Sequence, residues 1–479
     1  MGEGRCKDYL GVMSEADPLF ATLRQSADTD AVDAIERLVR EAPDRDLSRI
    51  NALAFAGRHD LDGQRVISAF LHAARLGLFE LSWNVLCPNC SGVLDANASL
   101  KSVRSQDYCA FCAAGCVPTL DENVEVTFTV APRVRHIAAH APNELPFADY
   151  VREVFFSSGV DLPDDYKQRM DRIMLDALEL PAGEKAQVSL QLPAGSVILF
   201  DPVTHAAHYL EVTGEPTSER RTLSFAYGNV KAPTETTELP PGPLRITLDN
   251  RSPERVLPGL WISGPEMNDM IGRRRPFLTA KHLFTNQTFR DLYRTDTLDI
   301  DQRLKITSLT FLFTDLKGST DLYERVGDLV AFDLVQSHFK VLHEIVAQED
   351  GAVVKTIGDA VMATFPTPDR ALAAALRMRE AMDELNRKSS NADLLLKIGI
   401  HEGPCLAVNL NERQDYFGQT VNIASRVQGL AGTRSILTTA PVVQNPDAAA
   451  ILQAGGLKPT AQQRSVRGVA GEVAIYEIP

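Results

Sequence analysis

Clustered and alternating apolar residues divide the last third of the chain into short strands and longer helices. Residues 307–314 form an apolar run of strand length, and residues 353–365 contain two such runs around Gly358-Asp359, which predicts a hairpin with a two-residue turn. Further strands are predicted at residues 394–400 and 472–478. Between them, apolar residues at helical spacing predict a helix that packs on the sheet through Phe332, Val335, Phe339, Leu342 and Val346.

The middle of the chain has a different pattern. In residues 118–265, apolar and polar residues alternate over several short runs, the first of them 124–130, and turns rich in Pro and Gly separate the runs. This pattern predicts an antiparallel β-sandwich. It contains no catalytic constellation, because His136 and His140 are four apart but have no third metal ligand nearby in sequence.

Residues 1–85 are predicted to be mostly helical, with an amphipathic helix at 64–75 followed by Gly77. A winged helix-turn-helix would imply DNA binding. Acidic residues outnumber basic ones over residues 1–80, whereas a DNA reader is expected to be basic. A protein-interaction or packing module is therefore the favoured interpretation.

Two aspartates, Asp315 and Asp359, each follow an apolar strand at a predicted turn. After Asp315, the residues Gly318, Ser319 and Thr320 are expected to open a helix, whose free N–H groups and dipole would form an anion site. An aspartate beside a bound phosphate is explained if a divalent cation lies between them. Two such carboxylates on neighbouring strands can hold two metal ions around a reacting phosphoryl group.

A third motif begins at Asp415 and continues through Gly418 into a predicted helix that carries Asn422 and Arg426. These two residues are four apart and therefore share one helix face. An arginine beside a phosphoryl centre can neutralise charge in the transition state, and an asparagine can orient a sugar.

Together these motifs resemble those of class III nucleotidyl cyclases, over residues 304–479. The resemblance rests on Phe313-Thr-Asp315-Leu-Lys-Gly-Ser-Thr, Lys355-Thr-Ile-Gly-Asp359, Asp415-Tyr-Phe-Gly and Asn422-Ile-Ala-Ser-Arg426, in this order. It implies an α+β sandwich of ferredoxin-like type that is active as a head-to-tail homodimer. One protomer would supply the metal-binding aspartates, and the facing protomer would supply the base readers, the asparagine and the arginine.

The resemblance also implies roles for individual residues. Asp315, Asp359 and the backbone carbonyl of Leu316 would bind two magnesium or manganese ions. Asn422 would hold the ribose, and Arg426 would contact the α-phosphate. Many relatives place a lysine that binds the triphosphate near the last strand; this chain has Arg467 there.

Lys355 and Asp415 match the residues that read the base. Lysine donates to adenine N1 and aspartate accepts from the N6 amine, whereas guanine presents the opposite pattern. Guanylate-making relatives usually carry Glu and a small residue at these places. The resemblance therefore favours conversion of ATP to 3′,5′-cyclic AMP and pyrophosphate. A guanylate cyclase, or a non-enzymatic zinc-ribbon protein with a relict cyclase domain, are the alternatives.

Four of the seven cysteines form two C-x-x-C pairs, Cys87/Cys90 and Cys109/Cys112, separated by 18 residues. This spacing predicts a structural zinc ribbon at residues 86–117. Cys116 is an alternative fourth ligand. Four protein ligands would leave no open position on the metal, so the site would stabilise structure and perform no chemistry.

The length of 479 residues and the net charge of −14 limit the number of domains and the kinds of partner that we expect. Its length suits about three domains, and its charge argues against a nucleic-acid surface. No apolar run reaches transmembrane length and the first residues lack a signal core, so we expect a soluble, cytoplasmic protein. Residues 266–303 are expected to be a linker in which a helix at 281–293 relays signals to the cyclase domain, from a regulatory region whose ligand or partner the sequence does not identify.

Overall fold

The computed structural model describes residues 16–228, 234–294, 298–299, 302–317, 324, 326–388, 394–410, 413–467, 469 and 472–479. The chain folds into two compact units. Unit 1 comprises residues up to 118 together with Glu122–Leu278, and unit 2 comprises Thr119–Asp121 together with Thr279–Pro479. Within the described part of the chain, every helix is too short or too polar to cross a membrane.

Unit 2 is built on a mixed sheet with the order β15-β16-β14-β17-β19-β21-β20, in which β18 also pairs with β17. All neighbouring strands are antiparallel except β17 and β19. The hairpin predicted around Gly358-Asp359 is confirmed. The strands are β14 (Leu304–Lys317), β15 (Ala352–Ile357), β16 (Ala360–Phe365), β17 (Leu395–Leu410), β18 (Arg413–Phe417), β19 (Ile436–Thr439), β20 (Thr460–Ser465) and β21 (Glu472–Ile478).

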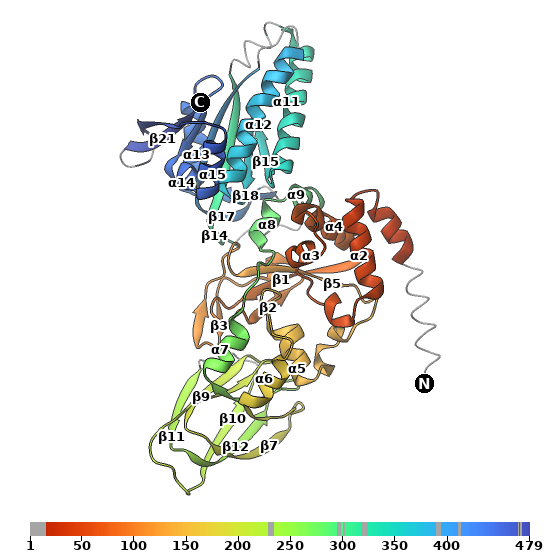
Figure 1. Cartoon of the computed structure of the whole chain (residues 1–479), viewed down its shortest axis with the longest axis vertical. Helices are drawn as coiled ribbons and strands as arrows, with labels where there is room; N and C mark the ends of the chain where they lie inside the picture. The colour runs from red at the N-terminus through yellow and green to blue at the C-terminus, as the bar shows by residue number, and fades with distance from the viewer. Residues whose placement is uncertain are drawn as a thin grey trace. The chain divides into compact units, whose positions relative to one another are not determined.

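Helices cover both faces of this sheet. The long helices α11 (Asp328–Gln348) and α12 (Pro368–Lys388) lie side by side in Figure 1. They share one apolar core with the short helices α14 (Ala440–Gln444) and α15 (Pro446–Ala454). Helix α13 (Gln419–Leu430) belongs to a second core. Successive residues of β19 point into different cores, which places α13 on the opposite face from the others.

Two sequence-based expectations for unit 2 need correction. Asp315 lies inside β14, which continues to Lys317, and not in the turn that follows. Phe332 is 56% exposed and is not a core residue. The predicted residues Val335, Leu342 and Val346 are buried, but the buried face of α11 begins at Ala331, and Phe332 lies about 100° further around the helix from Ala331.

The segment before β14 also belongs to unit 2. The single helix predicted at residues 281–293 is two short helices, α8 (Ala280–Phe284) and α9 (Gln287–Leu292). The break occurs because the side chain of Asn286 accepts a hydrogen bond from the Phe289 N–H at 2.9 Å and so caps a new helix.

The three residues Thr119–Asp121 belong to unit 2, although the residues on either side of them in sequence belong to unit 1. The N–H of Leu120 donates to the Lys305 carbonyl at 2.9 Å, and the N–H of Lys281 donates to the Leu120 carbonyl at 2.8 Å. The Asp121 carboxylate accepts from the backbone N–H groups of Thr307 and Ser308 at 3.0–3.1 Å. Because a bulge interrupts the β14–β17 ladder here, Asp121 satisfies donors that the ladder leaves open.

The first part of unit 1 is helical, as the sequence predicts. A helix at residues 16–23 precedes α2 (Thr29–Glu41), α3 (Ala52–Arg58) and α4 (Gly63–Leu76). Asp28, Asn51 and Asp62 cap the last three helices with their side chains. Helix α4 ends at Gly77, whose φ of 76° is in the left-handed region that glycine adopts without strain.

Three sheets of unit 1 follow these helices. One has the order β2-β1-β5, with β1 (Phe79–Leu86), β2 (Val93–Asn97) and β5 (Val124–Val130). The others form the β-rich part, with orders β10-β12-β7 and β11-β9-β8-β13-β6. Their strands are β6 (Met174–Ala177), β7 (Lys185–Leu192), β8 (Gly195–Asp201), β9 (Ala206–Val212), β10 (Arg221–Tyr227), β11 (Glu235–Leu239), β12 (Gly242–Asn250) and β13 (Gly259–Ser263).

The predicted pairing of this region is wrong in two respects. The strands β10 and β12, and the strands β11 and β9, pair parallel and not antiparallel. The strand β5 belongs to the sheet of β1, where its polar residues are buried as well as its apolar ones. Glu125 is fully buried because it accepts hydrogen bonds from Asn84 and Ser158.

Short elements complete unit 1. The strands β3 (Asp107–Cys109) and β4 (Ala114–Cys116) form a hairpin. Cys109 and Cys116 are the last residues of these strands, and Cys112 lies between the strands. The helices are α5 (Phe147–Tyr150), α6 (Tyr166–Ile173) and α7 (Pro265–Gly272), with single turns η1 (Asp44–Leu47), η2 (Leu100–Ser102), η3 (Ala138–His140), η4 (Pro142–Glu144) and η5 (Val151–Phe155).

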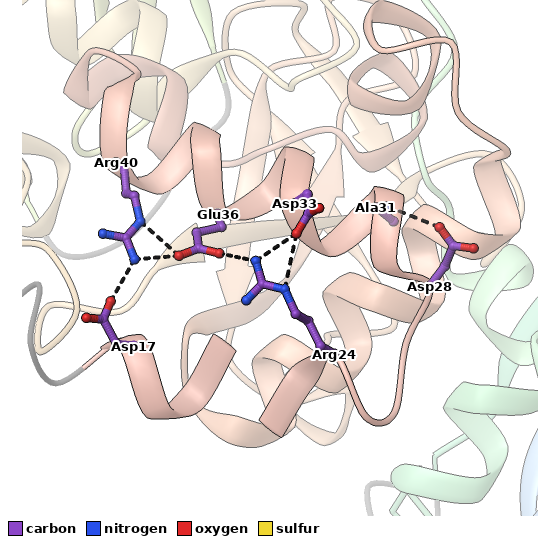
Figure 2. Close-up of polar contacts among 7 residues, drawn as sticks. All are labelled: Asp17, Arg24, Asp28, Ala31, Asp33, Glu36 and Arg40. Carbon is purple, nitrogen blue, oxygen red and sulfur yellow. Dashed lines mark hydrogen bonds and ion pairs between the residues drawn. The ribbon is translucent and has the colours of Figure 1, made fainter. Parts of the chain in front are cut away.

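Ion pairs join the first helical segment of unit 1 to α2 (Figure 2). The carboxylate of Glu36 lies between two guanidinium groups, those of Arg24 and Arg40. Arg24 also pairs with Asp33 at 2.7 Å, and Arg40 pairs with Asp17 at 2.6 Å. Burial by itself would raise the pKa of Glu36, but the hydrogen bonds from both arginines outweigh it and lower that pKa below its ordinary value.

We therefore expect Glu36→Gln to lower the free energy of unfolding at pH 7 by about 1 kcal/mol, because one carboxylate serves two arginines. The pKa of Glu36 is lower in the folded chain than in the unfolded one. Its contribution is then complete above an unfolded pKa of 4.5 and is lost as pH falls through the folded value. Urea unfolding of the full chain at several pH values measures the effect.

The matched control is Glu41→Gln, an exposed glutamate at the end of the same helix. A Glu36→Gln effect no larger than that of Glu41→Gln, or one that persists unchanged down to pH 3, would contradict this account of the network.

Candidate active site

Asp315 and Asp359 lie at the same end of two paired strands. Asp315 is near the end of β14, and Asp359 occupies the turn that precedes β16. Thr314 pairs with Val361, so the antiparallel register continued by two residues places Asp359 opposite Leu316. Gly358 makes this turn with a φ of 63°, a conformation that most other residues adopt only with strain.

The electrostatic state of this pair fits a cation site. Burial raises the pKa of Asp315, and the negative charge of Asp359 raises it further, while Lys397 and a hydrogen bond from Gln428 act in the opposite direction. Atom Oδ2 of Asp359 is buried and has no hydrogen-bond partner among the described residues. An unpaired carboxylate oxygen beside a second carboxylate is the donor set that Mg²⁺ or Mn²⁺ prefers.

His338 lies behind Asp359 and was missed by the sequence analysis. It is fully buried on α11, against the backbone of Asp359, and its Nδ1 atom is 3.4 Å from the sulfur of Met382. Burial lowers the pKa of His338 to about 4, so the imidazole is neutral at physiological pH. A polar residue on the apolar face of a predicted helix was the signal that could have identified it.

Lys355 and Asp415 meet although they are 60 residues apart. Nζ of Lys355, on β15, forms an ion pair with Oδ2 of Asp415, on β18. The other oxygen of Asp415 accepts a hydrogen bond from the Tyr416 N–H at 2.8 Å. Lys355 remains 42% exposed at its side chain, so the pair is accessible to a ligand at its edge.

Asn422 and Arg426 both lie on α13, as the spacing predicts. Asn422 is exposed and Arg426 is half-buried. The helix starts after Gly418, whose φ is 148°. It approaches the sheet closely at Gly399, where an added Cβ would lie 2.2 Å from the backbone nitrogen of Gln428. This close packing brings Gln428 to Asp315 and fixes α13 beside the carboxylate pair.

Other expected site residues are less informative. Gly318, Ser319 and Thr320 lie outside the described residues. Leu316 is buried on β14, and Arg467 is exposed in the turn that follows β20. The ring of His401 has a structural partner, the Thr439 hydroxyl, at 2.7 Å.

The structure therefore brings the expected residues together in two groups. Asp315 and Asp359 form one group, and Lys355 and Asp415 form the other. Among the described residues, no hydrogen bond or ion pair joins one group to the other. A substrate that binds both groups could therefore use the two groups of one chain, or one group from each of two chains.

Large apolar side chains are exposed close to these groups in sequence. Ile357 is 53% exposed between Lys355 and Asp359, and Phe417 is 66% exposed two residues after Asp415. Of the large apolar side chains found exposed in the described residues, all but Val117 belong to unit 2. They are Leu329, Val330, Phe332, Ile357, Leu410, Phe417 and Leu430.

A second candidate site lies in unit 1, where four cysteines converge. Ligand atoms of Cys87, Cys90, Cys109 and Cys112 all lie within 4.8 Å of one another. The sulfur atoms of Cys90 and Cys109 are 3.8 Å apart, and thiolates bound tetrahedrally at about 2.3 Å to a zinc ion are about 3.8 Å apart. The geometry of the cluster therefore fits a zinc ion.

The residues around this cluster hold one of its sulfur atoms in place by a hydrogen bond and by close packing. The Gly92 N–H donates to the Cys90 sulfur at 3.3 Å, and a side chain at this position would collide with the ring of Phe155. Cys116 lies outside the cluster. Burial raises the pKa of the Cys116 thiol to about 11, and this thiol donates a hydrogen bond to the Leu86 carbonyl at 3.5 Å.

Two protein families match this chain. Residues 302–472 match the family described as the adenylate and guanylate cyclase catalytic domain. Residues 13–291 match a family described as one of unknown function, DUF5939.

The individual relatives match about a third of this chain. An adenylate cyclase of Anabaena cylindrica is 30% identical over 185 residues, which cover 36% of this chain and 36% of the relative. Adenylate cyclase 2 of Rhizobium meliloti (strain 1021) is 32% identical over 148 residues, which cover 28% of this chain and 40% of the relative. The chain thus spans well under half the length of these curated relatives.

Among solved structures, the adenylyl cyclase CyaB from P. aeruginosa is 21% identical. The match covers 37% of this chain and 96% of that one, with a TM-score of 0.33, and at these values it adds nothing to the argument. The two family matches account for most of the chain. The protein belongs to the DUF5939 family, and it carries a class III adenylate and guanylate cyclase catalytic domain after the region that defines this family.

Proposed function

We propose that unit 2 converts ATP to 3′,5′-cyclic AMP and pyrophosphate. The observation that carries the proposal is the pairing of Lys355 with Asp415, two residues whose donor and acceptor match the edge of adenine. The curated relatives with 28–32% identity that carry the name adenylate cyclase support the same substrate.

Asp315 and Asp359, with the carbonyl of Leu316, would hold two magnesium or manganese ions. When bound, such ions lower the pKa of the attacking hydroxyl and neutralise charge on the phosphates. The ribose 3′-hydroxyl would lose its proton to solvent and its oxygen would bond to the α-phosphorus, while the bond from that phosphorus to the bridging oxygen breaks and pyrophosphate leaves.

The other residues orient the substrate and stabilise charge. Lys355 donates to N1 of adenine, and Asp415 accepts from its N6 amine. Asn422 holds the ribose. Arg426 lies four residues further along α13 and neutralises the charge that develops on the α-phosphate. Gly318, Ser319, Thr320 and Arg467 are assigned to the triphosphate.

The proposal includes a homodimer in which each active site combines two protomers. Two features support it. Among the described residues, no hydrogen bond or ion pair joins the metal-binding group to the base-reading group. Large apolar side chains are exposed next to both groups in sequence, at Ile357 and Phe417. Large apolar side chains that stay exposed on a folded unit are typical of a protein interface. Head-to-tail pairing of two copies would bring the aspartates of one to the base readers of the other.

The cysteine cluster is proposed to bind one structural zinc ion. Reduced thiolates and an ATP-consuming reaction both suit the cytoplasm. The region that matches the family of unknown function is proposed to regulate the cyclase domain.

The first test is product formation by the purified full chain with Mn²⁺ and either ATP or GTP. We expect cyclic AMP from ATP. Changing Lys355→Glu together with Asp415→Cys should lower ATP turnover by roughly 10²-fold and permit use of GTP, because the hydrogen-bonding pattern at the base is altered. Lys340→Glu, on the exposed side of α11, is the control for the change in charge.

Cyclic GMP as the main product of the wild-type chain would identify a guanylate cyclase. No product from either nucleotide would favour the relict, non-enzymatic alternative. Full retention of ATP selectivity by the double variant would refute the assignment of Lys355 and Asp415.

The composite site is tested by mixing two inactive variants. Asp315→Ala removes a metal ligand, and Arg426→Ala should lower activity by roughly 10²-fold or more. A mixed dimer has one site with both defects and one with neither. Random pairing should therefore restore about a quarter of wild-type activity. If mixed dimers form but stay inactive, both residues act within one chain.

The zinc proposal is tested by metal analysis of protein prepared without chelator. We expect about one zinc per chain. Cys112→Ser should release the metal and expose unit 1 to proteolysis, whereas the control Cys116→Ser should retain it, because the Cys116 thiol is outside the cluster. Absence of zinc from the wild-type protein, or equal loss in both variants, would remove this ligand assignment.

A further inference from the structure

Helix α9 is part of the compact unit that holds the candidate active site, although it precedes the cyclase match. All of it except the last residue, Leu292, lies within residues 13–291, the region that matches the family of unknown function. Its contacts reach two strands, β15 and β18, which carry Lys355 and Asp415. No motif in the sequence indicates this role.

Arg290, on α9, bridges these two strands with one nitrogen atom. Its Nη2 atom donates to the carbonyl of Val354 at 3.3 Å and to the carbonyl of Gln414 at 3.0 Å. Each acceptor immediately precedes a base reader, Lys355 in the first case and Asp415 in the second. A charged donor strengthens both bonds relative to a neutral one.

The neighbouring contacts reinforce this arrangement. On β15, the N–H of Val353 donates to Oε1 of Gln287, one turn before Arg290, at 2.8 Å. On β18, the hydroxyl of Tyr416 donates to the carbonyl of Phe284 at 3.2 Å. Both residues beside Asp415 in sequence are thus bound to the segment of α8 and α9.

The two strands need such a bridge because they do not pair with each other. Strand β15 pairs with β16, and β18 pairs with β17. The β15–β16 ladder is also irregular between Val353 and Lys355, so it constrains the position of Lys355 less than a regular ladder would. The spacing of the readers therefore depends on contacts outside the sheet.

We propose that Arg290 is a positioning residue that holds Lys355 and Asp415 at the spacing that selects adenine. This inference rests on the proposed function of that pair as base readers. It assigns part of the substrate choice to a helix outside the matched catalytic domain. A displacement of α9 would therefore alter the recognition of the base more than it alters the positions of the metal-binding aspartates.

The test compares Arg290→Met with Arg294→Met. Methionine keeps an apolar stem of similar length and removes every donor. Arg294 follows α9, is 74% exposed, and has an ion pair with Asp291 at 3.7 Å, so it controls for loss of charge near the helix. The main readout is the ratio of the dissociation constants for GTP and ATP, measured calorimetrically with Ca²⁺, and the second is kcat and KM with Mn²⁺.

We expect Arg290→Met to lower the preference for ATP over GTP about tenfold, mainly through binding and KM, with kcat changed less than about threefold. Arg294→Met should match the wild type. Arg290→Lys keeps the charge but has one ammonium group in place of the planar fork, and it should give an intermediate loss. This conservative variant keeps the test decisive if the methionine variant folds poorly.

Mixing variants separates positioning from general destabilisation. In mixed dimers with Asp315→Ala, the one active site should show the wild-type KM for ATP. In mixed dimers with Arg426→Ala, the active site should keep the raised KM of Arg290→Met, because its defect belongs to the base-reading half. Equal weakening of ATP and GTP, or an unchanged preference in both Arg290 variants, would overturn the inference. A wild-type chain that binds ATP selectively but forms no cyclic AMP would refute the proposed function and leave the binding test of Arg290 intact.

Discussion

Repulsion between two neighbouring carboxylates, Asp315 and Asp359, is the constraint on which the arrangement of unit 2 depends. Two like charges about 4 Å apart repel by about 1 kcal/mol in water and by several times that in a protein. Burial first, and then this repulsion, raise the pKa of Asp315 above its ordinary value. The backbone must therefore hold both groups in place before any cation is present to compensate their charge.

Three features of the fold provide this rigidity. The long β14–β17 ladder anchors Asp315, the hairpin turn at Gly358 anchors Asp359, and α13 packs directly onto Gly399. A side chain at Gly399 would push α13 away from the sheet and would withdraw Gln428 from Asp315. The same packing fixes the distance of Asn422 and Arg426, on α13, from the sheet. One close approach of helix and strand thus connects the carboxylate pair with the residues assigned to sugar and phosphate.

Local chemistry made much of unit 2 predictable. The hairpin at Gly358-Asp359, the helix that carries Asn422 and Arg426, and the last strand follow from turn residues and apolar periodicity alone. The exposure of Phe332 was not predictable, because a one-residue difference in helix phase depends on what the helix packs against. The complete burial of Glu125 was not predictable for a similar reason, because its hydrogen-bond partners, Asn84 and Ser158, are distant in sequence.

The three residues Thr119–Asp121 bear on how such catalytic domains are combined with other regions. The family match begins at residue 302, yet the bulge in β14 takes its hydrogen-bond acceptors from Asp121. A catalytic domain cut at its family boundary would leave those N–H groups without an acceptor and would lack α8 and α9. Exchange of the upstream region during evolution would then require a replacement that also completes the catalytic sheet. Where a family begins in sequence and where a folding unit begins in space are, in this chain, different places.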